Sequence, residues 1–416
     1  MNKKTLLFLL FPLLLLSKSY LISDIPLPKL YIQNLDPYEC NEICMQDYLD
    51  RGMIFSFLAQ AEKTLENRTQ NNIRIMNISV LNLDMYRDSE GLRIAMILPY
   101  KKIGKYASST MNATFAYLIT KNYPFELKSY KVESENIEDL EETIKKIQQD
   151  GFNYIIAPLT QYGADNISII NPDINIYFPT INKKNIATTS PFLFYGGIDY
   201  QAQSDLLLEN AVSPLIIFHD RSSLGKKLAS YQESGFIDKN TTNKDLNSSF
   251  FEFEPEIAIN KVIKFSIARR TTNLENYLKE NDKLSDGSFF LNTPIIKSGM
   301  IMSQLTLYDT NVTNILSTQI NYDPILLSMT QYTDRKKMII ANSITKNDNL
   351  LIETNSLLGN DIVFDWINYT TTIGIDYFFH LITGESRNYN IMIEKNQMLY
   401  DIELLQPSIS RFIKYR

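Results

Sequence analysis

The stretch "LRIAMILPY", residues 92–100, is a near-continuous apolar run that ends in proline. Runs of this kind are typical of strands that are buried on both faces of a parallel sheet. The next segments alternate: 108–120 and 136–151 have helical periodicity, whereas 125–132 and 153–159 have the composition of strands. This β-α-β-α-β order with short connections predicts a doubly wound α/β sheet that begins at about residue 91.

A second alternation of the same kind begins at Pro214, after strand-like runs at 174–181 and 192–199. The fold class is therefore α/β with two successive doubly wound lobes that meet near 200–214. We expect lobe 1 at about 91–205, lobe 2 at about 206–340, returning segments at 341–405 and a tail at 406–416. In lobe 2 and beyond, the pattern predicts strands at 214–219, 248–254, 287–293, 313–318 and 337–344, helices at 222–235, 255–268, 298–308 and around 360–382, and a hairpin at 390–405.

The composition is that of a globular protein with more than one domain, because the 416 residues are 44% hydrophobic and 21% charged. The formal net charge of −6 gives no general attraction to nucleic acid or to anionic lipid. We therefore expect no nucleic-acid partner.

The N-terminus, "MNKKTLLFLLFPLLLLSKSYL", has the three parts of an export signal. Lys3 and Lys4 precede an apolar run, and Ser17 and Ser19 are small residues at the positions before a cleavage site. The apolar run is shorter than the roughly 20 residues of a transmembrane helix. We expect a signal peptide at 1–19, a periplasmic location and no integral membrane segment after cleavage, with an uncleaved anchor as the alternative.

An N-terminal extension at 20–90 precedes the first lobe and contains the two cysteines of the chain. Residues 45–66 have helical periodicity, and 73–86 has the pattern of one or two strands. In an exported protein, Cys40 and Cys44 are expected to form a disulfide, with Cys40 at or before a helix start and Cys44 in its first turn. Half of a metal site is the alternative, although no nearby His or third Cys completes it.

His219, Asp220, Ser222 and Ser223 bring the residue types of a hydrolytic triad into five positions. Neighbouring side chains at the end of a strand point to opposite faces, so His219 and Asp220 are not expected to face each other. A serine before helically spaced apolar residues is instead a helix N-cap. We interpret the stretch as a strand end and a cap, and the chain as a protein without enzymatic activity, cofactor or metal.

Several segments together resemble the type I periplasmic binding proteins, in an order closest to the penicillin-binding-protein activator branch. The resemblance covers about 90–405, and it implies two lobes that close on a cleft. The segments are "LRIAMILPYKKIGKYASSTMNATFAYL" (92–118), "IQQDGFNYIIAPLT" (147–160), "PFLFYGGIDYQAQSDLL" (191–207) and "IIFHDRSSLGKKLA" (216–229).

The resemblance also places candidate ligand residues at the cleft. In amino-acid-binding members, a Ser/Thr-rich turn after the third strand holds the ligand carboxylate with hydroxyl and backbone N–H groups. Here the corresponding turn offers only Thr160 and Gln161. Ligands of open α/β sheets bind beyond the carboxyl ends of the strands, which gives the candidates Tyr100, Lys101, Thr160, Gln161, Tyr195, Asp199, Asp220 and Arg221.

Two functions fit this reading. The first is an envelope partner or regulator, in cell-wall synthesis or the assembly of an envelope machine, and its partner is a protein. The alternative is a solute-binding protein that closes on a small-molecule ligand. Extended sequons of the form D-x-N-x-S/T make Asn240, Asn247 and Asn311 candidate glycosylation sites.

Overall fold

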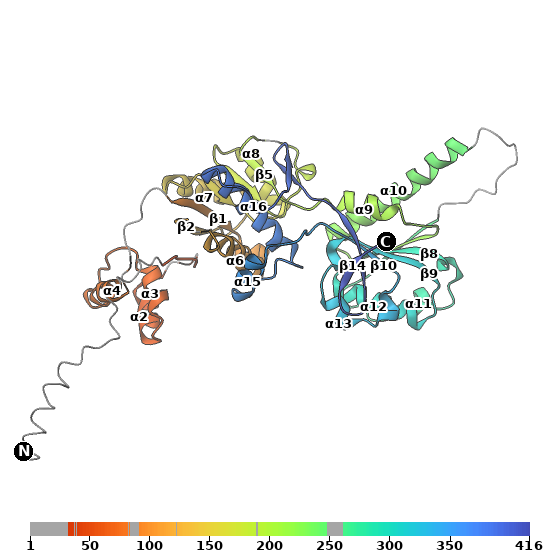
Figure 1. The fold of residues 1–416 in the computed structure, drawn as a ribbon, viewed down its shortest axis with the longest axis horizontal. Coiled ribbons are helices and arrows are strands. Elements are labelled where there is room, and N and C mark those ends of the chain that lie inside the picture. The colour runs from red at the N-terminus through yellow and green to blue at the C-terminus, as the bar shows by residue number, and fades with distance from the viewer. Residues whose placement is uncertain are drawn as a thin grey trace, which may run out of the picture. The chain divides into compact units, whose positions relative to one another are not determined.

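A computed structural model describes residues 32–36, 38, 40–81, 83, 91–121, 123–188, 190–247 and 261–416, without the side chains of 240–247. The chain divides into two compact units, Met1–Gly91 and Leu92–Arg416 (Figure 1). The expected signal peptide lies outside the described residues. Within them, no helix combines the length and the apolarity needed to cross a membrane.

The first unit is a small helical cluster packed around Met45, Phe57, Leu58 and Ala61. Cys40 and Cys44 form a disulfide, which confirms the predicted bridge. Cys40 precedes the first helix and Cys44 lies in its first turn, where the amide of Cys44 donates to the capping side chain of Asn41. The helices of this unit are α2 Glu42–Asp50, α3 Ile54–Gln60 and α4 Arg68–Val80.

The prediction of strands over 73–86 is wrong for residues 73–80, which belong to helix α4. The apolar residues of this run fit both the period of a strand and that of a helix. Asn67 decides in favour of the helix, because its side chain accepts hydrogen bonds from the amides of Thr69 and Gln70 and so caps the first turn. Ile73 and Ile78 then pack on the cluster.

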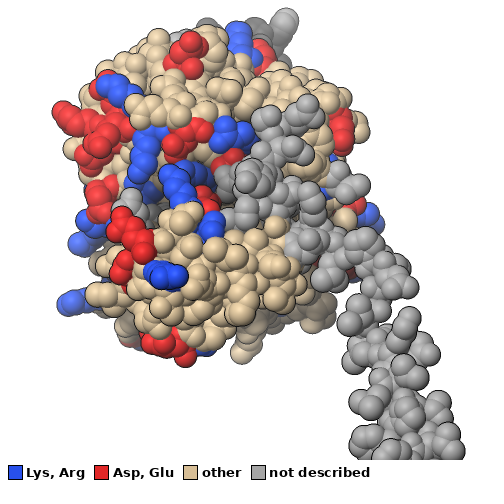
Figure 2. All heavy atoms as spheres, turned by 90° about the vertical axis from the view of Figure 1, so that its left-hand side faces the viewer, with Lys and Arg blue, Asp and Glu red and all other residues tan. Residues whose placement is uncertain are grey.

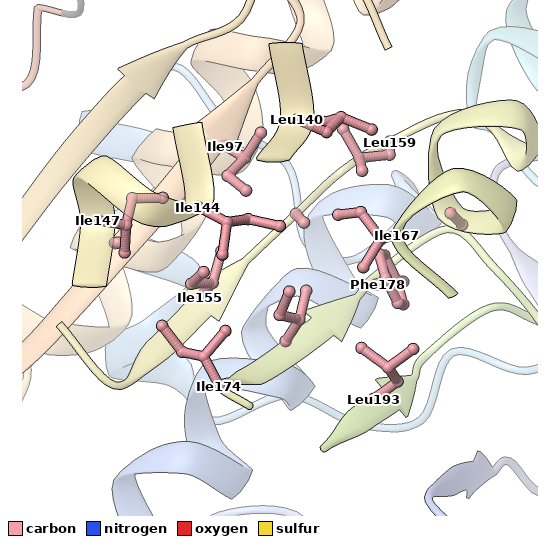
Figure 3. Close-up of a cluster of buried hydrophobic side chains, with 14 of the residues drawn as sticks. Ile97, Leu140, Ile144, Ile147, Ile155, Leu159, Ile167, Ile174, Phe178 and Leu193 are labelled. Carbon is pink, nitrogen blue, oxygen red and sulfur yellow. The ribbon is translucent and has the colours of Figure 1, made fainter. Parts of the chain in front are cut away.

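The second unit begins with the sheet of lobe 1, whose strand order is β11-β12-β5-β4-β3-β1-β2. Strands β1 to β5 pair in parallel, as the continuous apolar runs predict. Helices α7 and α8 supply side chains to the core on one face, and Figure 3 shows Ile144 of α7 and Ile167 of α8 in one cluster with Ile97 of β1. The elements are β1 Leu92–Leu98, α5 Tyr100–Ile103, α6 Lys105–Ile119, β2 Phe125–Lys131, α7 Ile137–Gln149, β3 Tyr154–Ile156, α8 Gln161–Ile170, β4 Asn175–Phe178 and β5 Leu193–Tyr195.

The sheet of lobe 2 repeats this arrangement with the strand order β14-β13-β10-β9-β8-β6-β7. Its core contains Phe218, Phe289 and Leu291. Two mostly parallel seven-stranded sheets with intervening helices confirm the predicted fold class. The elements are α9 Tyr200–Leu208, β6 Leu215–His219, α10 Ser223–Asn247, β7 Val262–Ser266, α11 Glu275–Leu278, β8 Gly287–Asn292, α12 Ile295–Leu307, β9 Val312–Ser317, α13 Ile325–Met329, α14 Tyr332–Arg335 and β10 Met338–Asn342.

The helix predicted over 255–268 is wrong where it can be compared. Val262–Ser266 is strand β7, which pairs in parallel with β6 along all five of its residues. Val262, Ile263 and Phe265 have the β-branched and aromatic side chains that suit a sheet surface, and Phe265 stacks on Phe218. The strand predicted at 248–254 lies outside the described residues.

The chain crosses between the lobes three times: after β5, after β10 and after β12. The second crossover, after β10, contains the helices α15 Asn349–Leu357 and α16 Trp366–Thr383. Both pack on α6 of lobe 1. The hairpin predicted at 390–405 is confirmed over 392–399, where two strands pair antiparallel, but residues 403–405 belong to a strand of the other lobe. Strands β11 Met392–Glu394 and β12 Gln397–Leu399 join the sheet of lobe 1, whereas β13 Glu403–Pro407 and β14 Phe412–Lys414 join that of lobe 2.

The surface agrees with the near balance of charges in the sequence. On the face that Figure 2 presents, basic and acidic side chains lie side by side. Described ion pairs such as Lys145–Glu141 and Lys128–Asp150 join neighbouring elements or turns.

Candidate functional site

The N-terminus of helix α8 holds a carboxylate that belongs to the chain itself. The amide of Thr160, the N-cap residue, donates to Glu135 Oε1 at 2.8 Å, and the hydroxyl of Thr160 donates to Glu135 Oε2. Glu135 is only 1% exposed. The third residue of the helix is Gly163, where an added Cβ would lie 2.9 Å from Glu135 Cδ. The glycine therefore leaves the space that the carboxylate occupies.

Helix α10 of lobe 2 repeats this arrangement with a different acid. Ser222 is the N-cap, because its hydroxyl accepts a hydrogen bond from the amide of Gly225 at 3.0 Å. Asp220 Oδ1 accepts hydrogen bonds from the amide and from the hydroxyl of Ser222. Gly225 is again the third helical residue, and an added Cβ there would lie 2.3 Å from Asp220 Oδ1.

A helix N-terminus presents unpaired N–H groups and a partial positive charge, which together attract anions. In each lobe, the N-cap residue of such a helix donates to an internal carboxylate: Thr160 to Glu135 before α8, and Ser222 to Asp220 before α10. The amide and the hydroxyl of Thr160 are therefore already occupied by a carboxylate of the chain itself.

The geometry around His219 agrees with the capping interpretation. Its Nδ1 lies 2.7 Å from the backbone oxygen of Asp220, whereas the Asp220 carboxylate contacts Ser222. The predicted serine cap is confirmed, with Ser222 rather than Ser223 as the capping residue. In the described part of the chain, these four side chains do not form a Ser-His-Asp relay.

A pocket of about 200 Å³ lies between the lobes, beside the first crossover. Lys184 and Asp199 form an ion pair at its wall. Tyr231 donates its hydroxyl to Asp205 at 2.8 Å, and burial, followed by the nearby Asp205 carboxylate, raises the pKa of Tyr231 to about 12. The wall is formed by Gln161, Asn182, Lys184, Asn185, Ile198, Asp199, Tyr200, Gln201, Ser223, Leu224, Lys227, Leu228 and Tyr231.

Of the eight residues predicted for the cleft, Gln161 and Asp199 line this pocket. Gln161 donates to Asp165 and to the backbone oxygen of Asn185, both at 3.0 Å. Asp199 also caps α9, since its Oδ1 accepts from the amides of Gln201 and Ala202. Thr160 and Asp220 take part in the helix-end contacts described above.

The other predicted residues lie elsewhere. Tyr195 is fully buried in the core of lobe 1, where it stacks on Phe178 at a centroid distance of 5.6 Å. Lys101 forms an exposed ion pair with Glu133 at 2.5 Å. Tyr100 is the first residue of α5, and Arg221 is exposed in the turn before α10.

Five residues of these contacts and of the pocket wall were not predicted from the sequence: Glu135, Asn182, Lys184, Lys227 and Tyr231. Asn182 and Lys184 follow the carboxyl end of β4, so the rule that placed the other candidates beyond strand ends would have found them. Tyr231 lies two turns inside α10 and Glu135 lies before α7. Neither position carries a local signal, because each contact is with a distant segment.

The candidate glycosylation residue Asn311 lies in an exposed turn before β9, where its Nδ2 donates to Asp286 at 2.6 Å. The side chains of Asn240 and Asn247 are outside those described.

The topology is that of two α/β lobes with three crossovers between them, which is the fold of periplasmic binding proteins. No family model and no curated protein matches the chain. Solved structures share the fold. A putative branched-chain amino acid ABC transporter protein from Rhodospirillum rubrum has a TM-score of 0.56 at 8% identity, covering 78% of this chain and 100% of that one.

Two further structures have the same fold. Full-length LpoA from Haemophilus influenzae has a TM-score of 0.53 at 12% identity, over 89% of this chain and 68% of that one. A solute-binding protein of an ABC transporter from Rhodopseudomonas palustris, in complex with 3,4-dihydroxybenzoic acid, has a TM-score of 0.53 at 12% identity, over 76% of this chain and 93% of that one.

Proposed function

We propose that this chain is an exported, non-enzymatic protein of the bacterial envelope that works by binding a protein partner, in cell-wall synthesis or in the assembly of an envelope machine. One observation carries the proposal. The Thr160 amide and hydroxyl, which correspond to the carboxylate-binding groups of amino-acid-binding members, hold the carboxylate of Glu135 instead. Displacing a buried, hydrogen-bonded carboxylate is costly, so a free amino acid is a poor competitor.

The extent of the structural likeness supports a protein partner. Leu92–Arg416 comprises 325 of the 416 residues, or 78%, which is also the share that the Rhodospirillum rubrum protein covers. The match with full-length LpoA covers 89% of the chain, so it extends into the helical N-terminal unit. The solute-binding matches cover less of the chain, 78% and 76%, and we take the N-terminal unit as the candidate for the contact with the partner.

The experiment compares the two kinds of partner directly. The mature protein is immobilised and exposed to a purified cell-wall synthase of its own organism, a penicillin-binding protein, and its affinity is measured by surface plasmon resonance. In parallel, pooled amino acids are titrated by calorimetry. We expect micromolar or tighter binding of the synthase, about −8 kcal/mol or stronger, and no heat from the amino acids. Micromolar binding of an amino acid without synthase binding would contradict the proposal.

The alternative function, capture of a small solute, is favoured by the interlobe pocket. Its wall combines amide, hydroxyl and amine groups on both lobes, with Asn182 and Gln161 on one side and Ser223 and Lys227 on the other. Such convergent polar groups suit a small polar molecule without a carboxylate, such as a sugar. Calorimetry with pooled sugars tests this, and Lys227→Ala should then weaken the binding that is found.

A further inference from the structure

A second and larger pocket, of about 510 Å³, lies at the crossovers themselves. We call it the crossover pocket. Asp199 and Ala202 reach it from the first crossover, Ser343 from the second and Ile402 from the third, while Lys395 and Met398 reach it from the β11–β12 hairpin. Its volume falls within the roughly 300–1,000 Å³ that is usual for sites of small organic ligands.

The lining of the crossover pocket has an apolar part and a basic part. Met398 is buried, and together with Ile402 and Ala202 it forms an apolar surface. Lys395 lies in the β11–β12 turn, and Lys183, which follows β4, donates from its amine at 2.5 Å to the backbone oxygen of Lys395. A surface of this kind matches a molecule with an apolar body and an anionic head.

The charges of the pocket favour an anion of low charge. Lys184 also lines the pocket, but its ion pair with Asp199 neutralises both groups. Lys183 and Lys395 then face the single carboxylate of Glu394. Among the described residues, the amine of Lys395 makes no hydrogen bond or ion pair, so it can meet a ligand without losing a partner.

We propose that the crossover pocket binds a small amphipathic carboxylate, with its chain along Met398 and Ile402 and its head at Lys395. This site is separate from the filled anion site at Thr160, and it does not depend on the proposed partner. The walls of the pocket come from the crossover segments that join the two lobes, so a bound molecule would contact all three crossovers.

The test uses decanoate as the probe and decanol as its uncharged match, with the full mature chain. Affinity is measured by calorimetry, and the position of binding by the methyl resonance of Met398 in protein labelled at its methionine methyl groups, assigned with Met398→Leu. We expect decanoate to bind more tightly than decanol and to shift the Met398 signal. Lys395→Gln should lower the affinity for decanoate by about three- to fivefold, which is the effect of one exposed charge pair. The same substitution should leave the affinity for decanol unchanged.

The matched control is Lys226→Gln, since Lys226 is an exposed lysine of α10 that lines neither pocket. It should bind decanoate as the unaltered protein does. No decanoate binding at millimolar concentration, an unshifted Met398 signal on binding, or equal weakening by both lysine variants would each overturn the proposal.

Discussion

The carboxylate of Glu135 accepts hydrogen bonds from both the amide and the hydroxyl of Thr160, twenty-five residues further along the chain. The backbone oxygen of Glu135 also accepts a hydrogen bond from Asn166 Nδ2 at 2.7 Å, which fixes this residue against α8. The contact does two things at once: it satisfies the start of α8, and it occupies the groups that could hold a ligand carboxylate.

Replacing Glu135 with alanine should both destabilise the fold and open an anion site. The Thr160 amide would lose its acceptor in a partly buried place, which costs about 1 kcal/mol in the free energy of unfolding. Urea denaturation measures this loss, and Glu142→Ala, at an exposed position of α7, serves as the control. In the Glu135→Ala protein, acetate at high concentration should recover part of the lost stability, with no such effect in Glu142→Ala. Unchanged stability would mean that the contact is not formed in solution.

The cap of α10 predicts different effects on stability for substitutions at two neighbouring serines. Ser222→Ala removes the hydroxyl that accepts from the Gly225 amide and should cost about 1 kcal/mol in the free energy of unfolding. Ser223→Ala is the matched control and should cost little, because Ser223 is the first helical residue and an alanine suits that place. Equal effects of the two substitutions in a denaturant titration would argue against the cap.

Tyr231 should make stability depend on alkaline pH in a defined window. Its pKa is raised from 10 to about 12, chiefly by burial and then by Asp205, so folding favours the neutral phenol. The stabilising contribution is therefore complete below pH 10 and is lost as the pH rises through about 12. Over that range the unaltered protein should lose unfolding free energy relative to Tyr231→Phe, which has no phenol to ionise. When the unaltered protein and Tyr231→Phe are titrated by ultraviolet absorbance, the difference between the two curves reports the ionisation of Tyr231. Its midpoint should lie near pH 12, and a midpoint near pH 10 would contradict the prediction.

The buried carboxylate of Asp376 fixes the second returning segment to lobe 1. It is fully buried and accepts from the Tyr117 hydroxyl at 2.9 Å, from the Asn388 amide at 2.7 Å and from Arg387 Nε at 3.3 Å. Asp376→Ala should destabilise the protein by about 3 kcal/mol, because it leaves the partly buried Arg387 charge without its carboxylate and the buried Tyr117 hydroxyl without its acceptor. Tyr117→Phe removes one hydroxyl and should cost about 1 kcal/mol. Thermal unfolding of both variants checks that Asp376→Ala loses more stability than Tyr117→Phe. A larger loss of stability for Tyr117→Phe would refute the prediction.

Local periodicity was enough to find most elements. The continuous apolar runs that became β1 and β6 could only be buried strands, and Gly151 and Asn136 delimited α7 at nearly its observed bounds. Where the period was ambiguous, local reasoning failed: residues 73–80 are a helix and 262–266 a strand, and each outcome depends on a cap or on a neighbouring strand.

The candidate site was predictable only where strand ends could be recognised. Gln161 and Asp199 follow strands β3 and β5, and both line the interlobe pocket. Tyr195 also ends a strand, yet its side chain turns into the core and stacks on Phe178. Which face a terminal residue takes depends on the register of the whole sheet, and a shift of one position reverses it.

By itself, the sequence determined the α/β alternation, the two lobes, the Cys40–Cys44 pairing and the serine cap of α10, because burial period, spacing and capping act between residues close in the chain. Only the tertiary structure decided that Glu135 fills the site on Thr160, that β12 and β13 part to different sheets, and that Lys395 and Asp199 share one pocket. Those outcomes join segments up to about two hundred residues apart, and they follow from the packing of whole sheets, which no local pattern encodes.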